Sequence, residues 1–194
     1  MDYNNCVLAI DIDGTLVPIV VNFDDLRAKI RKLLGIDHTL RPLAESLNNL
    51  QLDRELKAKA WSLVDQAELE SIDNIKLEDV RENLSAINQL ITNSSVEVVF
   101  VTMRSNKSAY PLLLKLGLLQ LAEKVITRDD YNTRREQLEG IKNQSRNKKI
   151  VFIGDTSHDE KTASEISLPF VKVSSYKELP LALARALNLC SIWL

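Results

Sequence analysis

The sequence predicts an α/β fold, a doubly wound parallel sheet that carries a small all-helical cap domain. Short unbroken runs of apolar residues alternate with helical stripes along the chain, and such runs are typical of strands buried on both faces. Polar residues follow directly after three of these runs, where parallel sheets bind their ligands. With 194 residues, 45% of them hydrophobic, the chain suits one domain with an insertion.

The first predicted strand, Val7–Ile10, runs into Asp11 and Asp13 and then into Gly14 and Thr15. Side chains two apart on a strand point the same way, so the two carboxylates can converge. They repel each other unless a cation or a shared proton lies between them. Gly14 permits a sharp turn and would leave nearby N–H groups free to face an anion. An Asp-Gly pair is also a common turn, so this segment alone leaves both interpretations open.

No strand pattern follows until residue 70, and the intervening segment is helical in character. Apolar residues recur at helical spacing up to Gly35, and two further helical pieces lie between Pro42 and Glu70. We therefore expect residues 17–71 to form an all-helical cap, and residues 1–16 and 72–194 to form the core. The first helix carries four basic side chains, Arg27, Lys29, Arg31 and Lys32, for which a solvated face is favoured over a lid for an anionic substrate.

The remainder of the chain alternates helices and strands, as a right-handed parallel sheet requires. The expected helices are Leu77–Ile91, Ser105–Leu116, Arg135–Gln144, a helix after Asp159, and Tyr176–Leu187. The expected strands are Val96–Val101, Lys124–Thr127, Ile150–Ile153 and Pro169–Val173.

Three predicted strands deliver polar side chains to the same edge of the sheet. The first brings Asp11 and Asp13, the next brings Thr102, and a later one brings Asp155 and Asp159. Carboxylate oxygens without histidine or cysteine suit a hard cation, and Mg²⁺ is the usual one where phosphate binds. No glycine-rich nucleotide-binding motif is present. These residues therefore predict a site for a metal ion and a phosphoryl group.

Composition argues against several other classes of protein. The net charge of -2, without a long block of one sign, gives no case for nucleic-acid binding. The N-terminal segment lacks the features of a signal peptide, and no membrane span is expected. Cys6 and Cys190 form no C-x-x-C motif, which favours reduced thiols and a cytoplasmic location, although a disulfide between them stays open. The apolar segment 191–194 either packs on the core or meets a partner, and the oligomeric state is not predicted.

These motifs resemble those of a known family. Asp11-Ile12-Asp13-Gly14-Thr15, Thr102 after its strand, and Gly154-Asp155 with Asp159 resemble motifs one, two and four of the haloacid dehalogenase superfamily, whose core is Rossmannoid. A helical cap placed directly after motif one is similar to the phosphoglycolate-phosphatase-like branch. In that family a tyrosine in the place of Asp13 accompanies dehalogenation, so Asp13 points to phosphoryl transfer.

The resemblance implies a role for each matching residue. Asp11 would attack phosphorus, Asp13 would protonate the leaving oxygen and then activate water, and Thr102 would bind a phosphoryl oxygen. Mg²⁺ would be held by the metal ligands Asp11, Asp155 and the backbone carbonyl of Asp13, with Asp159 supporting them from behind. Weaker substrate assignments fall on Arg104, Gly14 and Thr15.

One departure concerns motif three, which is usually a lysine. Arg134 stands closest to its place and would supply the positive charge, with Arg135 or Lys142 as alternatives. Pro18 also stands where many relatives carry an acidic residue. Four further side chains could touch a substrate but are expected to be structural or solvent-facing: His158, His38, Arg41 and Trp61.

The sequence thus predicts a Mg²⁺-dependent phosphomonoester phosphatase that hydrolyses a small phosphorylated metabolite, such as a phosphoglycolate-like compound or a sugar phosphate, through an aspartyl-phosphate. A phosphomutase with the same intermediate is one alternative. A non-catalytic phosphate-sensing or partner-binding module is another, although such a module has little use for Asp13.

Overall fold

A five-stranded parallel sheet lies at the centre of the computed structural model, which describes residues 5–93, 96–121 and 124–191. The strand order is β3-β2-β1-β4-β5. The strands are β1 (Cys6–Asp11), β2 (Glu97–Val101), β3 (Lys124–Ile126), β4 (Lys149–Gly154) and β5 (Phe170–Lys172). The central strand β1 pairs with β2 on one side and with β4 on the other, so the three polar strand ends are neighbours, as predicted.

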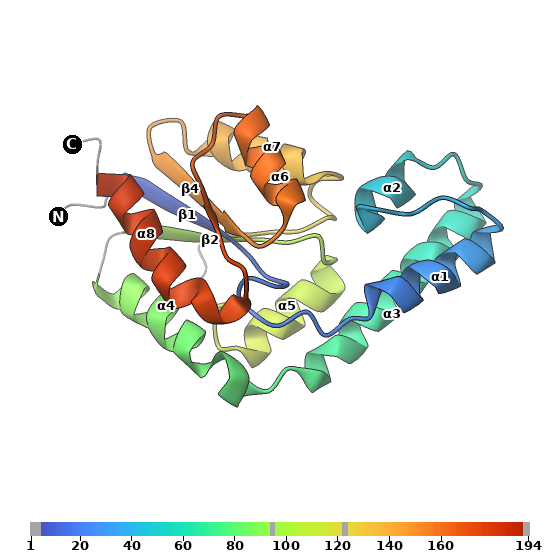
Figure 1. Cartoon of the computed structure of the whole chain (residues 1–194), viewed down its shortest axis with the longest axis horizontal. Helices are drawn as coiled ribbons and strands as arrows, with labels where there is room; N and C mark the ends of the chain where they lie inside the picture. The colour runs from blue at the N-terminus through green and yellow to red at the C-terminus, as the bar shows by residue number, and fades with distance from the viewer. Residues whose placement is uncertain (1–4, 94–95, 122–123, 192–194) are drawn as a thin grey trace.

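Helices cover both faces of the sheet, which confirms the doubly wound arrangement (Figure 1). Leu8 and Ile10 of β1 pack into one apolar cluster with α4 (Arg81–Asn93), α5 (Asn106–Lys115) and α8 (Leu179–Ser191). Val7 and Ala9 point to the other face, into a cluster with α6 (Arg134–Gln144) and α7 (Ser157–Glu165). Two short 3-10 helices, η1 (Leu77–Val80) and η2 (Tyr176–Glu178), precede α4 and α8. The unbroken apolar runs in the sequence reflect this burial on both faces.

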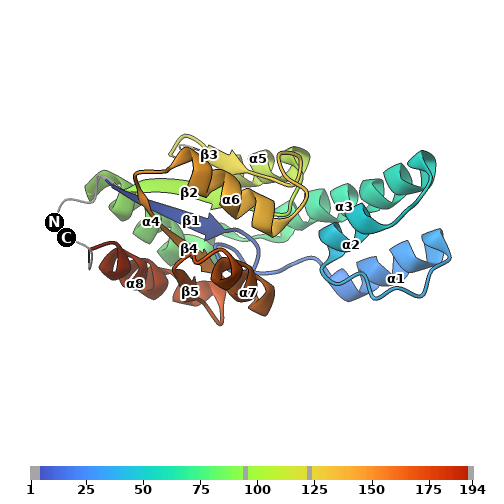
Figure 2. The same cartoon turned by 90° about the horizontal axis from the view of Figure 1, so that it is seen from above.

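The elements between β1 and η1 are all helices, which are joined by loops and extend beyond the end of the sheet (Figure 2). They are α1 (Phe23–Leu34), α2 (Leu43–Asn49) and α3 (Arg54–Asn74). The α1 helix begins after Asn22, whose side chain accepts a hydrogen bond from the Asp25 N–H, and ends at Gly35 with φ 64°. The three helices enclose an apolar cluster of their own that includes Ile30, Leu47 and Val64.

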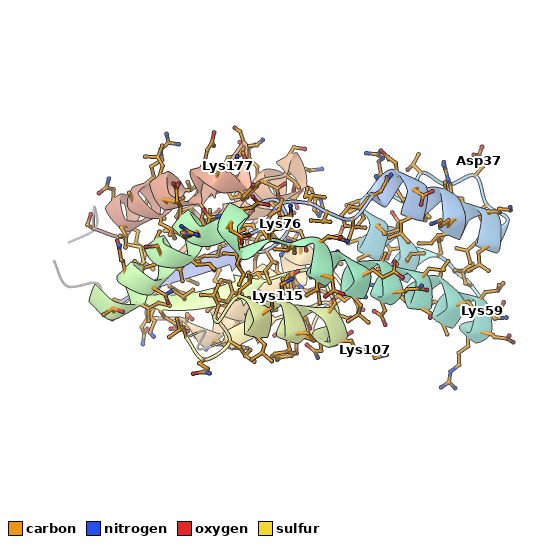
Figure 3. The ribbon with its side chains drawn as sticks, turned by 90° about the horizontal axis from the view of Figure 1, so that it is seen from below. Asp37, Lys59, Lys76, Lys107, Lys115 and Lys177 are labelled. Atoms are coloured by element: carbon orange, nitrogen blue, oxygen red, sulfur yellow. A yellow bond between two sulfur atoms is a disulfide. The ribbon has the colours of Figure 1, made fainter. Side chains whose placement is uncertain are left out.

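The long helix α3 joins this helical segment to the core. It continues through residue 71 to Asn74, and its C-terminal part lies beside α5 (Figure 3). Lys115 on α5 donates hydrogen bonds to the carbonyl oxygens of Ile72 at 2.6 Å and Asp73 at 3.5 Å, which lie in the last turn of α3. A cation at this end of a helix is favoured because the last carbonyls there lack helical partners. The domain boundaries at residues 17 and 71 stay a prediction.

The two cysteines are bonded to each other, so the expectation of reduced thiols is wrong for this structure. Cys6 opens β1, and the last turns of α8 return to the same end of the sheet, which brings Cys190 to a Cα–Cα distance of 6.0 Å. Their separation of 184 residues hid this proximity in the sequence. None of the described helices is long and apolar enough to cross a membrane. Apart from Ser191, the C-terminal segment 191–194 lies outside the described residues.

Asn83 provides a test of how the loop after β1 is held. Its buried side-chain amide on α4 donates to the carbonyls of Leu16 at 2.8 Å and Tyr176 at 2.9 Å. Asn83→Ala leaves both acceptors unpaired and should lower the free energy of unfolding by about 1–3 kcal/mol, measured by urea unfolding. Asn88→Ala, at an exposed asparagine of the same helix, is the control and should change it little. Equal losses in the two variants would contradict this role.

Candidate active site

The loop after β1 places two aspartates above the edge of the sheet. Asp11 ends the strand and is only 4% exposed, and Asp13 follows it into the loop. Gly14 has φ +89°, and a Cβ atom there would overlap the Asp155 carboxylate. Glycine is therefore required because the β1 loop and the β4 loop touch at this point.

The weak substrate assignments to Gly14 and Thr15 gain no support. The loop closes on itself, and the Gly14 N–H donates to the Val17 carbonyl at 2.8 Å, so this N–H is not one of those that could face an anion. The Thr15 side chain is fully buried, and its hydroxyl has no hydrogen-bond partner among the described residues. Neither residue lines the cavity described below.

Arg134, at the start of α6, lies against Asp11. Its Nη2 donates to Asp11 Oδ1 at 2.5 Å, and its Nε lies 3.0 Å from Asp159 Oδ1. The guanidinium stacks over the Phe152 ring at 5.6 Å and is buried. The two alternatives considered for this position lie elsewhere, since Arg135 pairs with Glu139 on the surface and Lys142 donates to the Ile166 carbonyl. The structure thus brings Arg134 to Asp11 and Asp159, and its part as the motif-three cation stays a prediction.

The β4 loop contributes Asp155 and Asp159. Asp159 is buried in the first turn of α7, where its carboxylate and the Thr156 side chain form a capping box. Asp159 is thereby fixed behind Arg134. Asp155 Oδ1 is buried and has no hydrogen-bond partner within the described part of the chain. A buried, unpaired carboxylate oxygen needs a partner that the protein itself does not provide.

The crowding of carboxylates perturbs their protonation. Burial raises the pKa of Asp11 well above its usual range and Arg134 opposes this, while Asp159 and Asp13 raise it further. Burial, together with Asp159, raises the pKa of Asp155 to about 6. Burial alone would lower the pKa of Arg134, but the attraction of Asp11 and Asp159 raises it instead. The site therefore carries excess negative charge that a cation would relieve.

The site offers few side-chain donors for a metal ion. Across residues 5–93, 96–121 and 124–191, no three histidine, cysteine or acidic side chains are gathered to hold a metal ion together. Mg²⁺ nevertheless commonly takes only one or two carboxylates, with water and phosphate oxygens completing its coordination. Asp155, with its unpaired oxygen, and Asp11 fit that pattern, and the Asp13 backbone carbonyl would be the third protein donor. The Asp13 carboxylate itself is engaged elsewhere.

Arg104 holds the Asp13 carboxylate. Its Nε and Nη2 donate to Asp13 Oδ2 and Oδ1, each at 2.8 Å, in a bidentate pair. Arg104 is only 2% exposed, whereas the Asp13 side chain is 21% exposed. Arg104 also lines the cavity described below, so its weak assignment to the substrate stays a prediction beside the observed contact with Asp13.

Thr102 follows directly after β2, next to the residue that pairs with Asp11. Its hydroxyl accepts the Arg104 N–H at 3.1 Å and keeps its own proton to donate. Its carbonyl accepts from the buried Gln137 side chain on α6 at 2.8 Å. Gln137 was not foreseen, because nothing in the sequence marks a polar residue in the middle of that helix as buried.

A cavity of about 710 Å³ lies between these strand ends and the helices α1–α3. Phe23, Leu43 and Val64 provide an apolar wall on the cap side. The floor is formed by the polar residues at the strand ends, namely Asp11, Asp13, Thr102, Arg104, Arg134, Asp155 and Asp159. This volume falls in the range of small-molecule sites. Arg27, with a side chain only 14% exposed, lines the cavity, so the expected solvated face holds for Lys29 and Lys32 but not for Arg27.

The four side chains expected to be structural or solvent-facing fall in two groups. His158 and Arg41 line the cavity, whereas the exposed His38 accepts a hydrogen bond from the Leu40 N–H. Trp61 lies half-buried beneath the Arg128 guanidinium. Trp61 therefore has the structural place that was expected, and His158 faces the cavity.

Glu45 on α2 connects the cap to the first turns of α6 and α7. Its Oε1 accepts from the Arg134 N–H at 3.1 Å and lies 3.0 Å from His158 Nε2. The hydrogen bond to His158 lowers the pKa of Glu45 and raises that of His158. Sequence reasoning missed Glu45, because its partners lie 89 and 113 residues away.

This pair makes a pH-dependent contribution to stability. Because the pKa of Glu45 is lowered from its ordinary value of 4.5, the ion pair stabilises the folded protein above pH 4.5. This stabilisation is lost as the pH falls below 4.5. Because the pKa of His158 is raised from its ordinary value of 6.5, the ion pair stabilises the folded protein below pH 6.5. This stabilisation is lost as the pH rises past 6.5 and through the higher pKa of His158 in the folded protein. Glu45→Gln should therefore lower the free energy of unfolding most between pH 4.5 and pH 6.5. The expected loss is about 0.2–1 kcal/mol, because both side chains are partly exposed.

The measurement is urea unfolding of wild type and Glu45→Gln at several pH values. Glu78→Gln, at an exposed glutamate outside the site, is the control and should give a difference that varies little with pH. A Glu45→Gln difference that stays constant from pH 5 to pH 9 would contradict the assigned ion pair.

Comparison with known proteins places the chain in a family. Residues 26–173 match the family model described as haloacid dehalogenase-like hydrolase. Among solved structures, a haloacid dehalogenase-like hydrolase from Streptococcus pneumoniae is 15% identical with a TM-score of 0.63, covering 93% of this chain and 97% of that one. A protein from Haemophilus somnus described as a predicted phosphoglycolate phosphatase is 15% identical, with a TM-score of 0.56 and coverage of 87% and 85%.

A third similar structure is CbbY from Rhodobacter sphaeroides, solved in complex with phosphate. It is 11% identical to this chain with a TM-score of 0.58, covering 89% of this chain and 95% of that one. No curated protein sequence matches the chain. The solved structures support the fold, and the family model covers most of the sequence. The chain therefore belongs to the haloacid dehalogenase-like hydrolase family.

Proposed function

We propose that the protein is a Mg²⁺-dependent phosphomonoester phosphatase that acts on a small phosphorylated metabolite through an aspartyl-phosphate. The observation that carries this proposal is the buried Asp11 carboxylate, bound by Arg134 through one oxygen and lining a cavity of about 710 Å³. A carboxylate held in this way is oriented for attack on an electrophile that enters the cavity.

The reaction would proceed in two steps. Asp11 Oδ2, the oxygen that Arg134 does not bind, would form a bond to phosphorus while the bond from phosphorus to the ester oxygen breaks. Asp13 would give its proton to the departing oxygen. Water would then attack the phosphorus of the aspartyl-phosphate and lose a proton to Asp13, which regenerates Asp11 and releases inorganic phosphate.

The remaining residues would stabilise charge on the phosphoryl group. Arg134 and the Thr102 hydroxyl lie at the cavity floor, where they would offer hydrogen bonds to its oxygens. Mg²⁺, held by Asp11, Asp155 and the Asp13 carbonyl, would neutralise negative charge on the same oxygens. The guanidinium of Arg134 would take the part that a lysine plays in motif three, with a forked rather than a point-like donor geometry.

Two similar proteins support phosphoryl chemistry, one by its description as a predicted phosphoglycolate phosphatase and the other by its bound phosphate. A phosphoglycolate-like compound or a sugar phosphate is the substrate class that the resemblance suggests. A phosphomutase would share the first step and pass the phosphoryl group to a sugar hydroxyl in place of water.

A cytoplasmic location stays a prediction, and the cysteine pairing removes one of the reasons for it.

The test is release of inorganic phosphate from 2-phosphoglycolate, glucose 6-phosphate and p-nitrophenyl phosphate, with Mg²⁺ and with a chelator. Asp11→Asn should reduce turnover by at least about a thousandfold, because removing a nucleophile removes the pathway through it. The chelator should likewise abolish turnover. Asp37→Asn, at an exposed aspartate of the cap, is the control and should leave turnover unchanged. Full activity in Asp11→Asn would rule out the proposed mechanism.

A further inference from the structure

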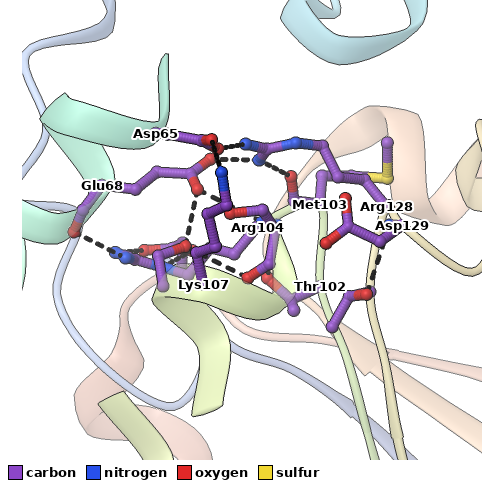
Figure 4. A network of polar contacts seen from close by, with 12 residues as sticks. Asp65, Glu68, Thr102, Met103, Arg104, Lys107, Arg128 and Asp129 are labelled. Atoms are coloured by element: carbon purple, nitrogen blue, oxygen red, sulfur yellow. Dashed lines mark hydrogen bonds and ion pairs between the residues drawn. The ribbon is translucent and has the colours of Figure 1, made fainter. Parts of the chain in front are cut away.

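Arg104 connects the catalytic carboxylate Asp13 to the cap helix α3. One edge of its guanidinium makes the bidentate pair with Asp13. Its Nη1 donates to the Glu68 carbonyl at 3.0 Å, and its Nη2 also donates to the Ser71 hydroxyl at 2.9 Å (Figure 4). Glu68 and Ser71 both belong to α3, so this helix determines where the guanidinium can lie.

The same stretch of α3 is fixed to the core by a buried ionic cluster. Glu68 Oε1 accepts from Arg128 Nη1 at 2.5 Å, and Oε2 accepts from the Ser108 hydroxyl on α5 at 2.6 Å. Arg128 also pairs with Asp65, one turn earlier on α3 (Figure 4), and its guanidinium stacks over the Trp61 ring at 4.7 Å. Every charge in the cluster has an opposite partner, and the side chains of Glu68 and Arg128 are 6% and 5% exposed.

Stability alone does not explain such a cluster. Apolar residues of similar size commonly stabilise a protein as well as a buried ion pair does, because burying charges is costly. Burial raises the pKa of Glu68 even with Arg128 beside it, which shows that this cost is present here. Directional contacts, in contrast, set the position of a helix closely, and here they set the part of α3 that contacts Arg104.

Asp13 depends on this support. Its carboxylate makes no hydrogen bond or ion pair with another side chain in the described part of the chain, and its exposed edge opens to the cavity. A planar fork fixes the plane of a carboxylate, whereas a loop residue without such a partner would sample several rotamers. Proton transfer demands close alignment, and a misplacement of about 1 Å can cost on the order of a hundredfold in rate.

We propose that Arg104 is a positioning residue that aligns Asp13 for proton transfer and makes this alignment depend on the cap helix α3. The inference rests on the proposed function, because it assumes that Asp13 protonates the leaving oxygen. The cap would thus contribute to the chemical step in addition to enclosing the substrate.

The test uses Ser71→Ala and Arg104→Lys and compares kcat/KM for two kinds of ester. The alkyl esters 2-phosphoglycolate and glucose 6-phosphate need a proton on the leaving oxygen, whereas p-nitrophenyl phosphate releases a stable anion without one. Because kcat/KM reports the steps up to the aspartyl-phosphate, it is insensitive to the later activation of water. Both variants should lower kcat/KM by about tenfold or more on the alkyl esters and by less than about twofold on p-nitrophenyl phosphate.

Lys107→Ala is the matched control, since exposed Lys107 lies 3.7 Å from Asp65 at the rim of the same cluster (Figure 4). It should leave kcat/KM unchanged on every ester. Equal losses on both kinds of ester in Ser71→Ala and Arg104→Lys would indicate a merely structural role and would overturn this inference alone. Absence of turnover in wild type would instead overturn the proposed function and the inference together.

Discussion

The burial of several carboxylates at one edge of the sheet is the constraint on which the rest of the site depends. Asp11 ends β1, Asp155 follows the neighbouring strand β4, and Asp159 lies just behind them. Like charges in a region of low dielectric repel strongly, so this arrangement persists only with cations supplied to it. The Arg134 guanidinium supplies positive charge to both Asp11 and Asp159, and its stacking on Phe152 allows it to be buried.

Much of the surrounding structure follows from this crowding. Gly14 is required because the β1 loop passes directly against Asp155. The capping boxes at the starts of α6 and α7 set the first turns from which Arg134 and Asp159 project. The protein offsets this negative charge only in part, since Asp155 keeps one buried oxygen without a hydrogen-bond partner among the described residues. A divalent cation would supply positive charge that the folded chain leaves out, and a phosphoryl group would bind beside that cation.

The cap is joined to the core by polar contacts on two sides of the cavity. Glu45 on α2 contacts the backbone of Arg134 and the side chain of His158, and it is partly exposed. On the other side, α3 is fixed by the buried Glu68–Arg128 pair. The exposed contact is the weaker of the two, because water competes for exposed ionic groups but not for buried ones. The α2 side is thus the part of the enclosure that can separate from the core at lower cost.

Local patterns in the sequence predicted the fold and the floor of the site. Apolar runs ending in Asp11, Thr102 and Asp155 show both the strands and the edge where their polar ends meet. Contacts between distant segments left no such sign. Glu45 with His158 and Cys6 with Cys190 become neighbours only when the chain folds.

Glu68 did leave a signal, because it lies four and eight residues after Val64 and Ala60 on the buried face of α3. A carboxylate on an apolar stripe indicates a buried partner, although the sequence cannot say that this partner is Arg128.

Chemical trapping of the intermediate tests the central claim most directly. Wild-type protein turning over p-nitrophenyl phosphate would be quenched in acid and treated with borohydride, which reduces an acyl phosphate to an alcohol, and the altered residue would be located by peptide mass spectrometry. The structure predicts that the reduced residue is Asp11, since its carboxylate is oriented toward the cavity by Arg134. Steady release of phosphate with Asp11 unmodified, or with the modification at another aspartate, would contradict the assignment of Asp11 as the nucleophile.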